Sequence, residues 1–392
     1  MSRHALAAKA PPSTVGSQRS PFTIDVMLGL VTMAGPLYID IMPAFIAALR
    51  TEYGLRPEQA GFVAASNGYG ATVGALLALF CVMRMPWRAS LVGLLLVLIA
   101  ADLVTMAISD FEMLLGVRFI HGIAGGLLVG FTYALMSQTA DPRRSFGVLF
   151  TFHFGFGGVG IALSSLLADM LHRGIVFGVL AGFSLAALIL VPMLPPFRQP
   201  GAAGASEADE KPWLTPPLLL RIGGIFLFQA ANLGLGAFLI GIGIDQGQTR
   251  LFAGSVVGIG LAAGVPGAVA MMMLSRTLGW RPIVPALVIA GLAKLLVIFG
   301  TTPAGFAVAV AAVYLTMAVA LPYVLASCAK DDAAGRATVL GGFASKLGLA
   351  CGPAVAGILY TMGSTVLVCA SVATVMLAAA CFALSFRIDP KR

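Results

Sequence analysis

Residues 88–108 read RASLVGLLLVLIAADLVTMAI, an apolar run whose interior holds one ionisable residue, Asp102. The hydrocarbon core of a bilayer is about 30 Å thick, so a helix needs roughly 20 apolar residues to cross it. A strand alone in lipid would leave its backbone N–H and C=O groups unpaired, whereas a helix pairs them within itself. The run therefore predicts a membrane-spanning helix.

The same kind of run recurs along the whole chain. Of its 392 residues, 59% are hydrophobic and only 10% are charged, and the mean hydropathy is +0.97. A water-soluble domain could not cover so much apolar surface with so few charges. We therefore expect an all-α integral membrane protein with twelve transmembrane helices. They are predicted at 22–48, 58–83, 88–108, 113–138, 144–170, 174–194, 216–244, 251–274, 282–301, 304–328, 336–361 and 364–386.

Lysine and arginine are distributed unevenly between the two sides of this predicted bundle. If both termini lie on one side, the loops of the other side hold only Arg50, Arg56, Arg173 and Arg250. Basic loop residues stay on the cytoplasmic side, so we expect both termini in the cytoplasm and the protein in the inner or plasma membrane. The net charge of +8 is dispersed over short loops, which argues against a nucleic-acid-binding surface.

The chain divides into two halves that repeat one another. A shift of about 192 residues places Arg144 on Arg336 and Gly160 on Gly352. Two six-helix halves with a solute site between them near the midplane are typical of alternating-access carriers. The expected segments are a cytoplasmic tail at 1–21, an N-terminal six-helix bundle at 22–194, a cytoplasmic linker at 195–215, a C-terminal six-helix bundle at 216–386 and a cytoplasmic tail at 387–392.

Two loops carry a pattern of arginines. Arg84 and Arg88 follow the second predicted helix, and Arg276 and Arg281 follow the eighth. With the twelve-helix repeat, these loops resemble the Gly-x-x-x-Asp-Arg-x-Gly-Arg type loop of the major facilitator superfamily, with Ser275 where the second loop would have its acid. The resemblance implies that the four arginines brace helix ends while the carrier changes conformation.

Two further motifs of that superfamily lie inside predicted helices. Residues 118–126, RFIHGIAGG, resemble its Arg-x-x-x-Gly-x-x-Gly-Gly motif, and residues 160–169 lie over the Gly-Pro-x-x-Gly-Gly pattern of its exporters, with an isoleucine in place of the proline. Small residues at such spacings let helices approach closely. The predicted packing residues are Gly122, Gly126, Gly160, Gly352 and Pro353.

The segment 38–45, YIDIMPAF, resembles the first helix of the drug:proton antiporter branch. The superfamily resemblance as a whole implies a secondary transporter that moves a small organic solute by alternating access. It further implies that the protein is not an enzyme, that it needs no cofactor, and that it is a monomer in the bilayer.

Asp40, in the first predicted helix, is a candidate proton-coupling acid. An ionisable group inside a span is costly unless it is paired or hydrated, and a half-dry cavity favours the neutral form of a carboxyl group, so Asp40 could load and release a proton near neutral pH. The alternative is a permanent ion pair with Arg118, whose other possible roles are to hold an anionic substrate group or to be purely structural. His121, one turn further along, could relay protons or be an ordinary interior histidine.

Lys346 is the leading substrate-binding candidate. It lies near the predicted midplane with no acid in the spans of its own half, so it needs either a substrate carboxylate or Asp40 as a partner. Its repeat position falls beside His153, so these two could face each other across the cavity. Asp102 and Lys294 occupy equivalent repeat positions, and we expect structural roles for them. Further substrate-binding candidates are Asn67, Tyr133, Gln229, Asn232 at the repeat position of Asp40, Tyr314 and Tyr323.

These residues favour a proton-coupled carrier. The expected cavity holds one acid, Asp40, and two bases, Arg118 and Lys346, so its charge is neutral to positive, which favours organic anions or zwitterions as the solute. The resemblance to the drug:proton antiporter branch favours export of lipophilic drugs instead. A membrane enzyme would need clustered metal ligands at a membrane face, and the sequence has neither such a cluster nor a nucleotide-binding Gly-rich Lys-Ser/Thr loop. Protons and a small organic solute are therefore the expected partners, with no catalytic or metal site.

Overall fold

The computed structural model describes residues 22–136, 138–139, 142–167, 174–197, 214–266, 282–327 and 336–388. All regular secondary structure within these ranges is helical. Seven of the described helices are long and apolar enough to cross a membrane, and four shorter apolar helical stretches accompany them. The predicted all-α membrane fold is thereby confirmed.

A described helix lies at each of the twelve predicted spans, the eighth being described as far as residue 266. The first half contains α1 (Phe22–Met33), α2 (Leu37–Asp40), α3 (Met42–Thr51), α4 (Pro57–Arg84), α5 (Trp87–Ala107), α6 (Phe111–Met136), α7 (Pro142–Leu167), α8 (Ile175–Leu190) and the 3₁₀ turn η1 (Val191–Met193). The second half contains α9 (Pro216–Asp245), α10 (Arg250–Ala262), α12 (Ile283–Leu295), η2 (Leu296–Phe299), α13 (Pro303–Ala326), α14 (Arg336–Thr361) and α15 (Ser364–Ile388).

The first predicted span, 22–48, is not one continuous helix. A turn at 34–36 separates α1 from α2, and Ile41 separates α2 from α3. Pro36 cannot donate a backbone hydrogen bond, and Gly35 lies so close to α6 that an added Cβ would be 2.6 Å from the carbonyl oxygen of Gly125. Asp40 is the last residue of α2. The two breaks therefore place its carboxylate beside irregular backbone, as in the discontinuous helices that form carrier binding sites.

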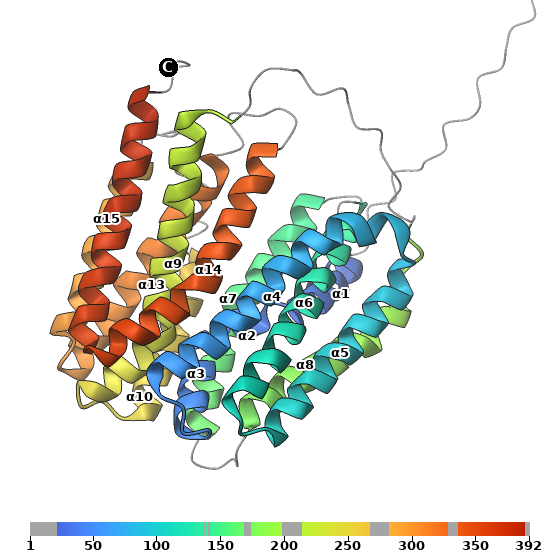
Figure 1. Cartoon of the computed structure of the whole chain (residues 1–392), viewed down its shortest axis with the longest axis horizontal. Coiled ribbons are helices and arrows are strands. Elements are labelled where there is room, and N and C mark those ends of the chain that lie inside the picture. Colours follow the sequence, from blue (N-terminus) through green and yellow to red (C-terminus); the bar gives the residue numbers. More distant parts are fainter. Residues whose placement is uncertain are drawn as a thin grey trace, which may run out of the picture.

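The helices form two bundles that lie side by side (Figure 1). One contains α1–α8, drawn in blue to green, and the other contains α9–α15, drawn in yellow to red. Between the bundles, α4 packs on α14, α7 on α10 and α3 on α9. Glycine makes this packing close, because an added Cβ on Gly158 of α7 would be 2.6 Å from the carbonyl oxygen of Gly258 on α10.

The described contacts between the bundles concentrate at one end of the molecule, which we call the closed end. There Gly357 near the end of α14 packs against the backbone of Pro57 at the start of α4. One hydrophobic core runs through the first bundle and into this end of the second, whereas the opposite end of the second bundle has a separate core that includes Phe228, Tyr323 and Phe382. In Figure 1, α4 and α14 accordingly diverge toward the end where the C-terminus lies, which we call the linker end.

Candidate functional site

Asp40 and His153 face each other inside the first bundle. Nδ1 of His153 on α7 lies 2.9 Å from Oδ1 and 2.8 Å from Oδ2 of Asp40 at the end of α2. The side chains are 13% and 21% exposed, respectively, so the pair is only partly dry. Gly157, one turn beyond His153, lets α7 approach, since a Cβ there would be 2.9 Å from Cβ of Asp40. The sequence placed His153 opposite Lys346 across the cavity, and the structure adds a hydrogen bond between His153 and the carboxylate of Asp40.

Lys346 approaches this pair from the other bundle. It lies on α14 with a half-buried side chain, close enough to His153 of the first bundle for the two groups to interact electrostatically. Within the described part of the chain, Lys346 has neither a hydrogen bond nor an ion pair. Tyr133 of α6 is close enough to Asp40 for the two groups to interact electrostatically, and 37% of Tyr133 is exposed. Asp40, His153, Lys346 and Tyr133 thus form the central site, with residues from both halves.

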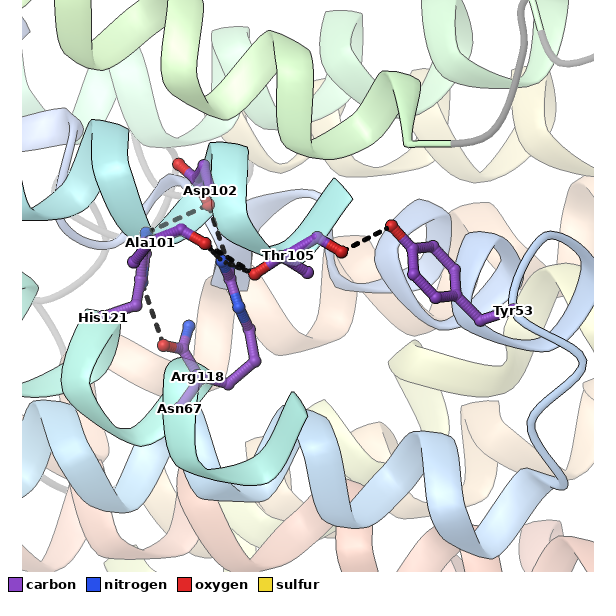
Figure 2. A network of polar contacts seen from close by, with 7 residues as sticks. All are labelled: Tyr53, Asn67, Ala101, Asp102, Thr105, Arg118 and His121. Atoms are coloured by element: carbon purple, nitrogen blue, oxygen red, sulfur yellow. Dashed lines mark hydrogen bonds and ion pairs between the residues drawn. The ribbon is translucent and has the colours of Figure 1, made fainter. Parts of the chain in front are cut away.

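Arg118 is not part of that central site. Its Nη1 donates to Oδ1 of Asp102 at 2.9 Å, and its Nη2 donates to the carbonyl oxygen of Ala101 at 2.9 Å and to the hydroxyl of Thr105 (Figure 2). The guanidinium also lies 4.9 Å from the ring centroid of Phe177. The alternative in which Arg118 pairs with Asp40 was therefore wrong for this conformation, because α5 presents Asp102 at the same depth while Asp40 faces α7.

His121 extends the same buried cluster. Its Nδ1 lies 2.9 Å from Oδ1 of Asn67, and its Nε2 lies 3.5 Å from Oδ1 of Asp102. Tyr53 reaches the cluster from the closed end, where its hydroxyl donates to the carbonyl oxygen of Thr105 at 3.1 Å (Figure 2). Because Asn67 and His121 are at most 1% exposed, neither can touch a solute in this conformation. The sequence predicted proton coupling for His121 and substrate contact for Asn67.

The second half buries several of the predicted binding residues inside its own bundle. Oδ1 of Asn232 accepts a hydrogen bond from Nζ of Lys294 at 2.8 Å, and Nε2 of Gln229 donates to the hydroxyl of Ser345 at 2.8 Å. Lys294 is only 1% exposed. Asn232, predicted to bind substrate at the repeat position of Asp40, is instead held in this conformation by a buried partner from α12. Tyr314 and Tyr323 are likewise buried, at 6% and 3% exposure.

The predicted brace arginines lie at the linker end. Nη2 of Arg88 donates to the carbonyl oxygen of Leu194 at 2.5 Å, and Nε1 of Trp87 donates to that of Phe197 at 3.3 Å. The loop after α4 is thereby tied to the segment that follows α8. Arg84, the last residue of α4, is exposed. Arg276 and Arg281 lie outside the described residues.

The predicted packing residues all lie at close helix contacts. A Cβ on Gly122 or Gly126 would overlap the backbone of α4, and one on Gly352 would overlap that of α9. A Cβ on Gly160 would lie 2.6 Å from the side chain of Ile41 beside the central site. The carbonyl of Pro353 packs against Gly61 across the interface between the bundles.

A cluster at the closed end was not predicted from the sequence. The Tyr360 hydroxyl donates to Oδ2 of Asp245 at 2.6 Å, and the ring of Tyr360 stacks on Phe238 with centroids 5.0 Å apart. Arg50 of the first bundle lies over the same ring, with Cζ 4.8 Å from its centroid. The only signal in the sequence was that Arg50 is one of the few basic residues on its side of the predicted membrane.

Comparisons with known proteins agree with this architecture. The model of a family described as "Uncharacterised MFS-type transporter YbfB" matches residues 35–385. The solved structure of the nucleoside transporter NupG is similar at 16% identity with a TM-score of 0.73, over 93% of this chain and 100% of that one. A D-xylose-proton symporter matches at 14% identity with a TM-score of 0.70, over 91% and 96%.

A third solved structure, a bacterial homologue of the human lysosomal transporter Spinster, matches at 15% identity with a TM-score of 0.70, over 95% of this chain and 98% of that one. At such low identities the likeness extends to the fold alone. A search of curated proteins finds no match.

Proposed function

The chain belongs to the YbfB-type family of major facilitator superfamily transporters, and from that premise we propose that it is a proton-coupled carrier of small organic anions. It is a secondary transporter of small solutes and not an enzyme. The proposal adds to this the coupling ion, the charge of the solute and the residues that act on each. It rests chiefly on the contact between Asp40 and His153 in the central site.

The Asp40–His153 pair is suited to hold and release a proton. A carboxylate and an imidazole within hydrogen-bond distance share one proton, and imidazole changes its charge between pH 5 and 8. The pair is partly exposed at the break in the first membrane helix. Protonation of Asp40 would remove the charge that holds α2 to α7. The state of charge can therefore control how these two helices pack.

Lys346 supports an anionic solute. A lysine inside a membrane-spanning helix is costly unless it is paired or hydrated, and the carboxylate of Asp40 already has His153 as its partner. A carboxylate or similar group on the solute would compensate the charge of Lys346. Tyr133 and His153 lie on the opposite bundle, so a bound anion would contact both halves, as alternating access requires.

The closed end supports an inward-facing conformation. With the linker end on the cytoplasmic side, as the distribution of basic loop residues predicts, the contacts of α4 with α14 and of α7 with α10 lie toward the outside. Arg50 over Tyr360 joins the two bundles there. Transport would then require that these outer contacts break while the linker ends of the bundles approach each other.

The test is uptake into proteoliposomes that contain the purified full-length protein, with an imposed pH gradient. Small carboxylates and lipophilic cations are offered side by side to the wild type, to Lys346→Ala and to Lys346→Arg. We expect pH-driven carboxylate uptake that is lost in Lys346→Ala and partly retained in Lys346→Arg. Uptake of lipophilic cations that is indifferent to both substitutions would instead identify a drug:proton antiporter.

A further inference from the structure

A cavity of about 270 Å³ lies between the two bundles at the closed end. α3 and α9 supply most of its walls, and the segment after α3 and the first residues of α4 and α10 supply the rest. No residue of the central site lines it. Pockets for drug-sized ligands measure roughly 300–1,000 Å³, so this volume suits a smaller molecule.

The charged groups that line this outer cavity are mainly cationic. Arg50 and Arg250 face it against one carboxylate, that of Asp245. Asp245 already accepts the hydrogen bond of Tyr360, and Arg50 rests on the aromatic face of Tyr360. Neither arginine forms an ion pair with any residue that the structure describes. The charged groups that line the cavity, two arginines against one carboxylate, therefore leave it with a net positive charge.

The remaining walls are apolar. Ile46 of α3 and Phe238, Ile240 and Ile244 of α9 surround the polar groups. An inorganic anion would leave this apolar surface uncovered, whereas an organic anion with a hydrophobic body would contact both kinds of wall. Guanidinium groups bind carboxylates through paired hydrogen bonds. We propose that the outer cavity binds a small amphipathic organic anion, such as an aromatic carboxylate, through Arg250 and Arg50.

The position of the cavity predicts what binding does. Its walls come from both bundles, so a bound anion contacts both and stabilises the conformation in which the closed end is assembled. A ligand that enters from outside would thus inhibit transport without occupying the central site. This regulatory consequence rests on the proposed carrier function and orientation, whereas the binding itself does not.

Benzoate is the probe, and its affinity for the full-length protein in nanodiscs is the measurement. Binding is measured in Lys346→Ala, which removes the cationic group of the central site, and in Lys346→Ala combined with Arg250→Gln. Arg56→Gln is the matched control, because Arg56 lies at the same end on the surface, pairs with Glu58 and does not line the cavity. Ala47→Phe, which fills the cavity from α3, tests the same site without a change of charge.

We expect Lys346→Ala to retain benzoate binding and Arg56→Gln to leave it unchanged. Arg250→Gln should weaken it about ten- to hundredfold, the loss expected for a charge-assisted hydrogen bond, and Ala47→Phe should do the same. Binding that disappears in Lys346→Ala, or that persists unchanged in both Arg250→Gln and Ala47→Phe, would overturn the proposal. Because binding is measured without a proton gradient, its outcome is independent of the proton-coupling test.

Discussion

Replacing Arg118 with methionine removes the cation of an ion pair whose two side chains are both 0% exposed. Three hydrogen bonds are lost, to Asp102, to Thr105 and to the backbone of Ala101. The carboxylate of Asp102 is then left buried without its counter-ion. Removing one partner of a buried pair costs about 3–5 kcal/mol, and we expect that loss of stability for Arg118→Met.

The double variant Asp102→Leu/Arg118→Met should recover most of this loss. Both charges are then gone, and replacing a buried pair with apolar residues of similar volume is often neutral or stabilising by about 1–4 kcal/mol. The comparison separates two roles for Arg118. If it only holds α5 against α6, the double variant is stable and transports; if it takes part in proton coupling, the double variant is stable and inactive.

The assay is thermal unfolding of the purified protein in one detergent, followed by pH-driven uptake for every variant that folds. Arg118→Met should lower the unfolding midpoint by several degrees, and the double variant should lie close to the wild type. Arg56→Gln serves as the control for loss of an exposed arginine, for which little change is expected. A single variant as stable as the wild type would refute the reasoning, because it would mean that the buried carboxylate tolerates the loss of Arg118.

Three further predictions follow from other contacts. Asp40→Asn should abolish pH-driven accumulation but retain exchange of solute across the membrane, measured as counterflow; accumulation that still follows the pH gradient would remove Asp40 from the mechanism. Arg50→Gln removes the guanidinium that lies over the ring of Tyr360 in the other bundle and should shift the carrier toward the outward-facing state, seen as increased labelling of a cysteine placed at Ile240 from the outside; unchanged labelling would count against a gate there. Gly122→Ala should cost about 1–3 kcal/mol by overpacking against α4, whereas Gly116→Ala on the same helix, which has open space, should be neutral or stabilising in the same unfolding assay.

Hydropathy alone was sufficient for the fold class and for the location of the membrane helices. A helix in lipid must be long, apolar and internally hydrogen-bonded, and these are local properties that a run such as 88–108 displays directly. The superfamily was recognisable for a related reason, since motifs such as 118–126 preserve small residues where two helices touch. Family membership is now confirmed by the match over residues 35–385.

The break in the first span was not foreseen. Hydropathy averages over Gly35 and Pro36 and reads the run 22–48 as continuous, whereas the close approach of Gly35 to Gly125 depends on how α6 packs. The position of Asp40 at the end of a short helix follows from that packing.

The partner of each buried charge was decided by the tertiary structure. Asp40, Asp102, Arg118 and Lys346 were all visible as ionisable residues inside spans, but which acid meets which base depends on the rotation and depth of helices far apart in the chain. Asp40 meets His153, and Arg118 meets Asp102, because a charge in a low-dielectric interior takes the partner that packing brings within hydrogen-bond distance. The sequence shows that a charge inside the membrane must be compensated. Only the packing of the helices determines which residue compensates it.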